Sequence, residues 1–380
     1  MMKNILITGG AGFIGSNLSL KLVEKGYKVT ALDNLSKQIH GNSPKNDSPL
    51  FKSIIDKVNF IEGNVVNKED LEKAISGQDA IIHLAAETGT GQSMYQIHHY
   101  AKVNIDATAM MLDILANTKQ HSVKKVIIAS SRSIYGEGKY LNSRNEAVYP
   151  KHRLDKNMQS GNFEVDYPGE TKPLQLVATD EDSKIHPSSV YGITKQVQEQ
   201  LIMTVCPTIG IAPVAFRYQN VYGPGQSLTN PYTGILSIFS TLIKNNKEIN
   251  VFEDGLESRD FVYIDDVVDA TILGLEKEEA NNQIFNVGTG KAVTVLKVVK
   301  ELQENYNSNV AIKISGNYRL GDIRHNYADL TKIKEILGFN PKISFKEGIK
   351  HFANWVITQE VHEDNYAESI AEMKEKGMFK

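Results

Sequence analysis

Tyr191 and Lys195 lie four residues apart at the start of a helical run that ends near Cys206. At this spacing, both side chains of a helix lie on one face. An ammonium group beside a phenol lowers the pKa of the phenol and stabilises the phenolate, so Tyr191 could act as a general base near neutral pH. The same spacing is common in ordinary exposed helices, so the pair alone does not establish a site.

Two serines strengthen this hypothesis. Ser131 and Ser133 follow the apolar run 125–129 (KVIIA), which predicts a buried strand. In a parallel sheet, the carboxyl ends of the strands border the ligand crevice. A serine hydroxyl at that edge can hydrogen-bond a substrate oxygen beside the tyrosine.

A glycine-rich segment follows the first predicted strand and opens the first predicted helix. Residues 9–15 (GGAGFIG) contain Gly9, Gly12 and Gly15 at the spacing of a dinucleotide-binding loop. Glycines permit a tight turn and let the backbone approach a pyrophosphate, which the N–H groups of the helix N-terminus can bind. The alternative is a structural turn that binds nothing.

The end of the second predicted strand carries Asp33. An acid at this place accepts hydrogen bonds from ribose hydroxyls and repels a 2′-phosphate. We therefore expect NAD rather than NADP as the cofactor. If the glycine segment were only structural, Asp33 would be a helix-capping or surface residue.

Strand-like and helix-like runs alternate through the first half of the chain. The strand-like runs are short, apolar and rich in β-branched residues, which predicts a parallel sheet covered by helices on both faces. An antiparallel α+β arrangement would need alternating strands and short hairpin turns, and few of these occur. The predicted strands are 3–8, 29–32, 58–62, 80–84 and 125–129, and the predicted helices are 13–25, 68–75, 95–118 and 189–205.

The composition limits the classes of protein. Of the 380 residues, 41% are hydrophobic and 23% are charged, which excludes a wholly disordered or fibrous protein. The single cysteine excludes an internal disulfide framework and a cysteine-based zinc site, and no metal is expected. A net charge of −3 gives no electrostatic case for nucleic acid or an anionic membrane as partner. No apolar run approaches the ~20 residues that span a bilayer and no secretory signal is visible, so we expect a cytoplasmic protein.

The order of glycine loop, acid, serine and YxxxK is that of extended short-chain dehydrogenases/reductases. Within them, the chain resembles the NAD-dependent nucleotide-sugar epimerase/dehydratase family. The resemblance implies an α/β fold with a Rossmann-type doubly wound parallel sheet and a smaller C-terminal α/β substrate lobe. Further motifs extend it over most of the chain: 83–86 (HLAA), 91–94 (GQSM), 103–104 (VN), 217–224 (RYQNVYGP), 258–263 (SRDFVY) and 319–322 (RLGD).

The resemblance implies a catalytic and a cofactor-binding set. Ser131 matches the catalytic serine, Tyr191 the base, and Lys195 its partner, which also contacts the nicotinamide ribose. The implied cofactor-binding residues are Gly9, Gly12, Phe13, Ile14, Gly15, Asp33, Asn34, Asn64, Val65, Leu84, Ala85, Ala86, Tyr191, Lys195 and Tyr218.

It also implies contacts with a nucleotide-sugar substrate. Asn220, Arg259 and Arg319 match positions that hold the substrate's diphosphate, where guanidinium groups suit phosphate oxygens. Phe252 falls where the family packs the nucleotide base. Surface ion pairs are the alternative for the two arginines. The implied substrate-binding residues are Ser131, Ser133, Asn220, Phe252, Arg259 and Arg319.

The domain organisation follows from length and resemblance. A single core stops growing at roughly 250–300 residues, so two lobes are expected. Residues 136–185 show neither helix nor strand periodicity and form an insert, and the charged C-terminal tail is either a solvated helix or a packing arm. The predicted division is 1–219 plus about 256–288 for NAD, about 220–255 plus 289–358 for the nucleotide sugar, and 359–380 for a helical tail.

The runs 95–118 and 189–205 resemble the two helices that pair across the family's dimer, which implies a homodimer. Their apolar stripes could equally belong to the core of one subunit. No nucleic-acid or membrane partner is expected.

The residues after Ser131 discriminate between reactions of the family. The 4,6-dehydratases carry an Asp-Glu pair where this chain has Arg132 and Ser133, and a decarboxylase would have Glu at 133. Arginine does not deprotonate at usable pH. The remaining reaction of the family needs only serine, tyrosine, lysine and NAD. It is oxidation of C4 of the sugar to a 4-keto intermediate, followed by re-reduction. We therefore expect a C4 epimerase.

Several stretches look closest to bacterial dTDP-L-rhamnose 4-epimerase-type proteins, which implies a dTDP-6-deoxyhexose substrate such as dTDP-L-rhamnose. The alternatives are a nucleotide-sugar 4-dehydrogenase or 4-ketoreductase with net redox turnover, and a cofactor-binding regulator without catalysis. The role of Arg132 stays open between a contact with substrate and a salt bridge to an acid of the insert. The stretches are 131–138 (SRSIYGEG), 219–228 (QNVYGPGQSL), 230–236 (NPYTGIL) and 371–373 (AEM).

Overall fold

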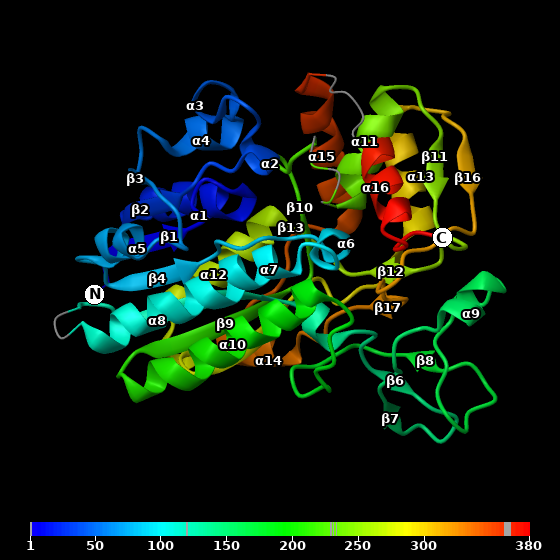
Figure 1. Cartoon of the computed structure of the whole chain (residues 1–380), viewed down its shortest axis with the longest axis horizontal. Helices are drawn as coiled ribbons and strands as arrows, with labels where there is room; N and C mark the ends of the chain where they lie inside the picture. Colours follow the sequence, from blue (N-terminus) through cyan, green and yellow to red (C-terminus); the bar gives the residue numbers. More distant parts are fainter. Residues whose placement is uncertain (1, 119–120, 229, 231, 233, 361–365) are drawn as a thin grey trace.

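A seven-stranded parallel sheet forms the centre of the computed structural model, which describes residues 2–118, 121–228, 230, 232, 234–360 and 366–380 (Figure 1). The strand order is β14-β9-β5-β4-β1-β2-β3, and every neighbouring pair is parallel. The order reverses between β1 and β4, and ligands of such sheets bind at this switch point. The strands are β1 Asn4–Thr8, β2 Lys28–Asp33, β3 Asn59–Glu62, β4 Ala80–His83, β5 Lys125–Ser131, β9 Ala212–Tyr218 and β14 Gln283–Val287.

Helices cover both faces of the sheet, as the alternating runs predict. Successive residues of a strand point to opposite faces, so Ile5 and Ile7 pack with α1 and α12 in one core while Leu6 packs with α5, α8 and α10 in the other. The predicted fold class is confirmed. The covering helices are α1 Phe13–Glu24 and α12 Ile264–Glu276 on one face, and α5 Lys68–Ile75, α8 Ala107–Asn117 and α10 Val190–Thr208 on the other.

The helix predicted over 95–118 is not one continuous α-helix. It consists of α7 (Ile97–Tyr100), a π-helical turn (Ala101–Asp106) and α8. Asn104 lies in the π-helical turn and bonds Thr194 of α10 (Nδ2 to Oγ1, 2.9 Å) and the carbonyl of Glu87 (3.1 Å). π-helical turns occur frequently at functional sites, and this one fixes the cavity-lining loop around Glu87 to α10.

A smaller part of the molecule lies beyond the carboxyl edge of the sheet (Figure 1). Helices α11, α13 and α15 pack there around three short sheets, β10-β13, β11-β16 and β15-β12-β17. The division into two lobes at the predicted boundaries stays a prediction. The elements are β10 Asn220–Tyr222, α11 Ile235–Lys244, β11 Ile249–Val251, β12 Ser258–Arg259, β13 Phe261–Tyr263, β15 Val293–Thr294, α13 Val295–Tyr306, β16 Ile312–Ile314, β17 His325–Asn326 and α15 Phe345–Thr358. Helix α14 (Thr331–Leu337) packs instead against β14 of the central sheet.

The insert 136–185 has short elements of its own, a three-stranded sheet β7-β6-β8 and helix α9. Such short pieces are too brief to produce a readable sequence period, which is why the sequence predicts neither helix nor strand there. The remaining elements are α2 Lys37–His40, α3 Pro44–Asp47, α4 Pro49–Ile54, α6 Thr90–Ser93, 3₁₀ turns at Arg132–Tyr135 and Glu278–Ala280, β6 Tyr140–Leu141, β7 Ala147–Val148, α9 Asp155–Gln159, β8 Gln175–Leu176 and α16 Tyr366–Glu375.

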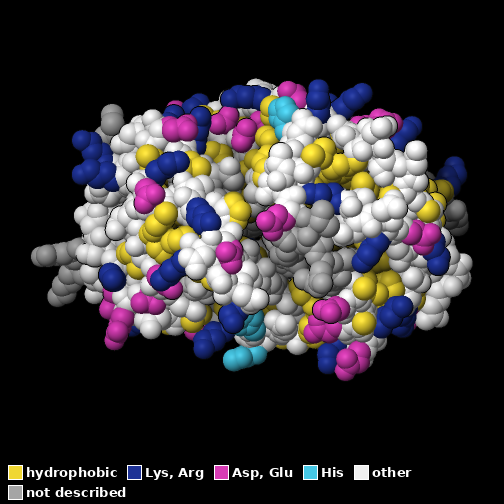
Figure 2. Space-filling model, turned by 90° about the horizontal axis from the view of Figure 1, so that it is seen from above, with side chains coloured by type: hydrophobic (Ala, Val, Ile, Leu, Met, Phe, Trp, Pro, Cys, Tyr) yellow, Lys and Arg dark blue, Asp and Glu magenta, His cyan; other side chains and the backbone are white. Residues whose placement is uncertain are grey.

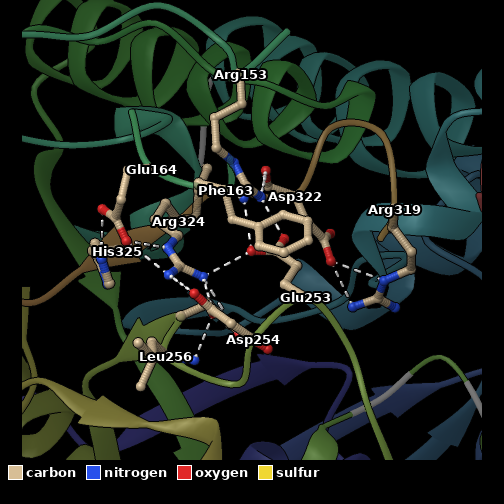
Figure 3. A network of polar contacts seen from close by, with 12 residues as sticks. Arg153, Phe163, Glu164, Glu253, Asp254, Leu256, Arg319, Asp322, Arg324 and His325 are labelled. Carbon is tan, nitrogen blue, oxygen red and sulfur yellow. Dashed lines mark hydrogen bonds and ion pairs between the residues drawn. The ribbon is translucent and has the colours of Figure 1, made fainter. Parts of the chain in front are cut away.

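Two buried arginines hold the insert against the smaller part (Figure 3). Arg153 of the insert donates to both carboxylate oxygens of Glu253 (2.8 Å each) and to the carbonyl of Asp322 (2.8 Å). Arg324, with no exposed side-chain surface, bonds Glu253, Asp254 of the same loop and Glu164 of the insert. The carboxylates of both parts thus share two guanidinium groups.

Charges of both signs are interspersed on the face of the molecule shown in Figure 2, with apolar side chains between them. This matches the small net charge of −3. None of the helices in the described residues is long and apolar enough to cross a membrane.

We predict that Arg153→Met destabilises the protein by about 3–5 kcal/mol, because it leaves the Glu253 carboxylate with fewer partners in a buried place. Chemical denaturation measures this. The control is Arg144→Met, since Arg144 of the same insert forms its ion pair with Glu146 at 72% exposure. It should change the unfolding free energy by less than about 0.5 kcal/mol. Equal effects of the two substitutions would contradict the role of the buried network.

Candidate active site

The glycine loop joins β1 to α1 in a turn that only glycine fits. Gly9 has a φ of +70°, and a Cβ there would lie 2.8 Å from the amide nitrogen of Ala85. A Cβ on Gly15 would lie 2.1 Å from the carbonyl oxygen of Gly9. Gly12 precedes α1 with no side-chain cap, so the first N–H groups of the helix face the cavity beside it without a capping side chain. This cradle fits a pyrophosphate.

Asp33 at the end of β2 is fixed by the loops around it. Its two carboxylate oxygens accept from the backbone N–H of Ala11 (3.0 Å) and of Leu35 (2.9 Å). His40 of α2 lies 3.8 Å away, and burial lowers the pKa of the His40 imidazole. Asp33 therefore braces the glycine loop as well as lining the cavity, where the sequence predicts only a contact with ribose.

One cavity of about 470 Å³ runs from the glycine loop to the smaller part. The switch point of the sheet lies at its centre, with the carboxyl ends of β1, β2, β4, β5 and β9 around it. All the predicted cofactor-binding residues line it: Gly9, Gly12, Phe13, Ile14, Gly15, Asp33, Asn34, Asn64, Val65, Leu84, Ala85, Ala86, Tyr191, Lys195 and Tyr218. The dinucleotide therefore has both a cradle for its phosphates and walls for its two ends.

Tyr191 and Lys195 lie in the first turns of α10, directly beside Ser131. The Ser189 hydroxyl caps the helix by accepting from the N–H of Gly192 (3.1 Å), which sets where the helix begins. The Lys195 Nζ donates to the carbonyl of Ala129 (3.0 Å) and lies 6.0 Å from the centre of the Tyr191 ring. Ser131 ends β5. The predicted catalytic residues thus meet at one wall of the cavity.

Burial sets the proton affinities at this wall. It raises the pKa of the Tyr191 phenol, while a hydrogen bond with Ser131 and the charge of Arg132 lower it by less. Burial also lowers the pKa of Lys195 to about 7. The Lys195 ammonium is therefore poised between its two protonation states near neutral pH. A site with these values is suited to proton transfer.

The structure divides the predicted substrate contacts into two groups. Ser131, Ser133 and Asn220 line the cavity. Phe252, Arg259 and Arg319 are not among the described residues that line it. The Arg259 guanidinium donates to the carbonyls of residues 258, 323 and 324.

Arg319 and Phe252 lie together at the edge of the smaller part. Arg319 forms an ion pair with Asp322 (2.8 Å) and its guanidinium lies 5.7 Å from the centre of the Phe252 ring. Their predicted roles toward the substrate stay predictions.

The C-terminal tail is a packing arm rather than a solvated helix. Glu372 of α16 accepts hydrogen bonds from Tyr95 (3.1 Å) and from Tyr232, which lines the cavity. Phe379 packs edge-on against Phe252, with the ring centres 5.0 Å apart. The tail therefore contacts both a cavity wall and the residue predicted to pack the nucleotide base. Residues 361–365 of the predicted tail lie outside the described residues.

Sequence reasoning missed residues that position the site without a motif of their own. The Ser93 hydroxyl accepts from the N–H of Tyr191 (3.0 Å). Glu199, eight residues further along α10, accepts hydrogen bonds from the Ser130 hydroxyl (2.5 Å) and from Nε and one terminal nitrogen of Arg217 (3.0 and 2.7 Å). A signal was present, because a charged residue at a core position of a helix implies a buried partner.

His83, His186 and Cys206 are not among the described residues that line the cavity. His83 is buried in β4, where burial lowers its pKa to about 3 and its ring bonds Thr8 (2.7 Å). His186 lies in a loop and bonds backbone carbonyls. Cys206 is buried in the core between α10 and the sheet, and burial raises the pKa of its thiol to about 12. It is therefore no base for the cavity.

Together, the doubly wound sheet and the Ser131, Tyr191 and Lys195 wall define a dinucleotide-dependent enzyme of the short-chain dehydrogenase/reductase type. The model of the NAD dependent epimerase/dehydratase family matches residues 5–155 and 166–288. A dTDP-L-rhamnose 4-epimerase of Burkholderia thailandensis is 36% identical over 367 residues, which are 96% of this chain and 97% of that protein. The chain belongs to the NAD-dependent epimerase/dehydratase family, and its cofactor is NAD.

Two solved structures extend the comparison. The UDP-glucose 4-epimerase of Thermotoga maritima with UDP-glucose has a TM-score of 0.73 and 32% identity, covering 93% of this chain and 98% of that one. The UDP-glucuronic acid 4-epimerase of Bacillus cereus, in complex with UDP-glucuronic acid and NAD, has a TM-score of 0.75 and 25% identity, covering 93% and 99%. Relatives with this fold thus bind nucleotide sugars that differ in the sugar.

We predict that Asp33→Ala reduces the preference for NAD over NADP by roughly tenfold, because it removes a negative charge that opposes a 2′-phosphate. Reconstitution of the apoprotein with each cofactor measures the ratio of affinities. Asp79→Ala is the matched control, since Asp79 also accepts two backbone N–H groups (2.7 and 2.9 Å) and is not among the described cavity residues. An unchanged ratio in Asp33→Ala would remove this role from Asp33.

Proposed function

We propose that the protein epimerises a nucleotide-activated sugar at C4, by transient oxidation to a 4-keto intermediate and re-reduction. The observation that carries the proposal is the meeting of Ser131, Tyr191 and Lys195 at one wall of the cavity that the glycine loop opens. The family membership and the 4-epimerases among the relatives support it.

The chain's own groups hold and move one proton. Ser131 hydrogen-bonds the sugar 4-oxygen, and Tyr191 takes the proton of the 4-hydroxyl as C4 is oxidised. Lys195, at 6.0 Å from the phenol ring, supplies positive charge that favours the phenolate. NAD, when bound, supplies the acceptor and the donor of the hydride. The keto sugar turns about its phosphate linkage, and Tyr191 returns the proton to the 4-oxygen after the opposite face of C4 is reduced.

The residues after Ser131 argue against dehydration and decarboxylation at this site. Arg132 and Ser133 stand where those reactions need an acid and a base, and the Ser133 hydroxyl bonds that of Ser131 (2.9 Å). Neither side chain can expel water or assist loss of a carboxylate by proton transfer at neutral pH. The buried Cys206 offers no further base.

For the substrate we propose a dTDP-6-deoxyhexose such as dTDP-L-rhamnose. The support is the Burkholderia relative, which is similar over nearly its whole length. Other relatives have names that specify UDP sugars, so the sugar and base are decided by experiment. We also propose a homodimer, formed through the faces of α8 and α10 that the sequence predicts.

The test is a panel of dTDP and UDP sugars incubated with the purified protein without added cofactor. We expect bound NAD in the protein and interconversion of two C4 epimers, read by NMR at C4. Formation of NADH in proportion to product would instead show a net oxidoreductase and contradict the proposal.

We predict that Tyr191→Phe keeps bound NAD and lowers kcat by roughly 10²–10⁴-fold, because general acid–base catalysis contributes about this much. Cofactor content is read from absorbance and turnover from the NMR assay. The control is Tyr27→Phe, since the Tyr27 hydroxyl bonds Glu276 on the surface away from the cavity. Near wild-type turnover in Tyr191→Phe would exclude this residue as the base.

A further inference from the structure

Arg132 directs an unsatisfied positive charge toward the cavity. It lines the cavity beside Ser131, and its Nε donates to the Asn220 side-chain oxygen at 2.7 Å. This is one of the five N–H groups of a guanidinium. The acidic residues of the insert that form ion pairs do so with other cations. None of the described carboxylates of the insert lies within 4.0 Å of a nitrogen of Arg132. The salt bridge that the sequence left open is therefore not formed.

A second guanidinium, that of Arg259, also lacks an ion pair and lies nearby. The backbone N–H of Asn220 donates to the carbonyl of Asp260 (2.9 Å). The segment of Asn220, which binds Arg132, is therefore adjacent to the segment of Arg259. Arg259 donates to three backbone carbonyls, which use three of its five N–H groups and bring no negative charge. Within the described chain, no carboxylate forms an ion pair with it.

Figure 3 shows two nearby carboxylates, those of Asp322 and Glu253, in ion pairs with other arginines. Asp322 is paired with Arg319, and Glu253 is shared between Arg153 and Arg324. Two further acids, Glu137 and Glu257, have pKa values raised to about 7 by burial, so they carry only part of a charge at neutral pH. Among the described residues, no carboxylate forms an ion pair with Arg132 or Arg259, and the charges of Asp322 and Glu137 act on both from a greater distance.

Two cations placed close together in a partly desolvated site cost free energy. Burial, and then the charge of Arg259, lower the pKa of Arg132 to about 9. Proteins rarely keep such a pair without an anion to bind. A guanidinium has the geometry to bind phosphate oxygens through two N–H groups at once.

We propose that Arg132 binds the diphosphate of the nucleotide sugar and shares that anion with Arg259. The inference rests on the proposed function for the identity of the ligand. Arg132, Ser131 and Tyr191 all line the same cavity, so a diphosphate bound by Arg132 leaves the sugar in the cavity that holds Ser131 and Tyr191. Asn220 is then a positioning residue, since its side-chain oxygen holds the Arg132 Nε.

The experiment compares wild-type holoenzyme with Arg132→Met and Arg132→Lys. Calorimetric titrations with dTDP and with UDP measure binding of a nucleoside diphosphate that has no sugar. We expect Arg132→Met to weaken this binding roughly tenfold to a hundredfold, as for loss of hydrogen bonds to a charged group. The KM for the nucleotide sugar should rise by a similar factor with kcat changed much less, and Arg132→Lys should recover part of the affinity.

Folding is monitored separately. Without ligand, Arg132→Met should melt at or above the wild-type temperature, because it removes an uncompensated charge. The shift in melting temperature on adding dTDP or UDP should shrink. Arg144→Met is the matched control, since it removes one guanidinium from the exposed surface of the insert and should leave every binding constant unchanged.

Unchanged affinity of Arg132→Met for the nucleoside diphosphates would overturn the inference. A fall in kcat larger than the loss of affinity would overturn it too, since Arg132 would then act mainly on the sugar. A shift of the pH profile to higher pH is expected in this variant, because the charge of Arg132 lowers the pKa of Tyr191. Wild-type protein that binds neither dTDP nor UDP would overturn it as well. Wild-type protein that binds one of them but epimerises no nucleotide sugar contradicts the proposed function alone, because the binding comparison needs no turnover.

Discussion

The site depends on one buried ion pair, between Glu199 and Arg217. The pair joins α10, which carries Tyr191 and Lys195, to β9, and Glu199 also bonds Ser130 of β5. Arg217 further bonds the hydroxyl of Tyr135 and a carbonyl at the end of the insert. A buried charge cannot be left unpaired without a cost of several kcal/mol, so these elements have essentially one arrangement relative to each other. The distances between Ser131, Tyr191 and Lys195 follow from that arrangement.

Ion pairs are distributed unevenly between the insert and the cavity. Around the insert, each of the buried guanidiniums of Arg153 and Arg324 is paired with carboxylates, and this network holds the loop 319–326 in place. Arg132, which lines the cavity, and Arg259 form no ion pair with a carboxylate among the described residues. A matched network stabilises the fold, whereas uncompensated charge attracts a ligand. The insert is thereby fixed against the smaller part of the molecule.

Much of the fold and the site could be predicted from the sequence. The parallel sheet, the glycine loop, Asp33 and the Tyr191–Lys195 pair lie as expected, because each rests on local spacing. The helical run predicted over 95–118 is present from Ile97 to Asn117, but the π-helical turn at Asn104 within it makes contacts that no periodicity encodes. The packing of Phe379 on Phe252 joins residues 127 positions apart (379 − 252) and has no local signal.

The sequence by itself determined the class of chemistry, because a glycine turn, a strand end and an i,i+4 pair are properties of a few consecutive residues. It also determined which reactions lack their acid and base, since Arg132 and Ser133 are read directly. Only the tertiary structure decided which charges find partners. Ion pairs such as Arg324 with Glu164, or Arg217 with Glu199, form between segments that meet only when the chain has folded. What stays unpaired after that, as at Arg132, is a property of the whole molecule.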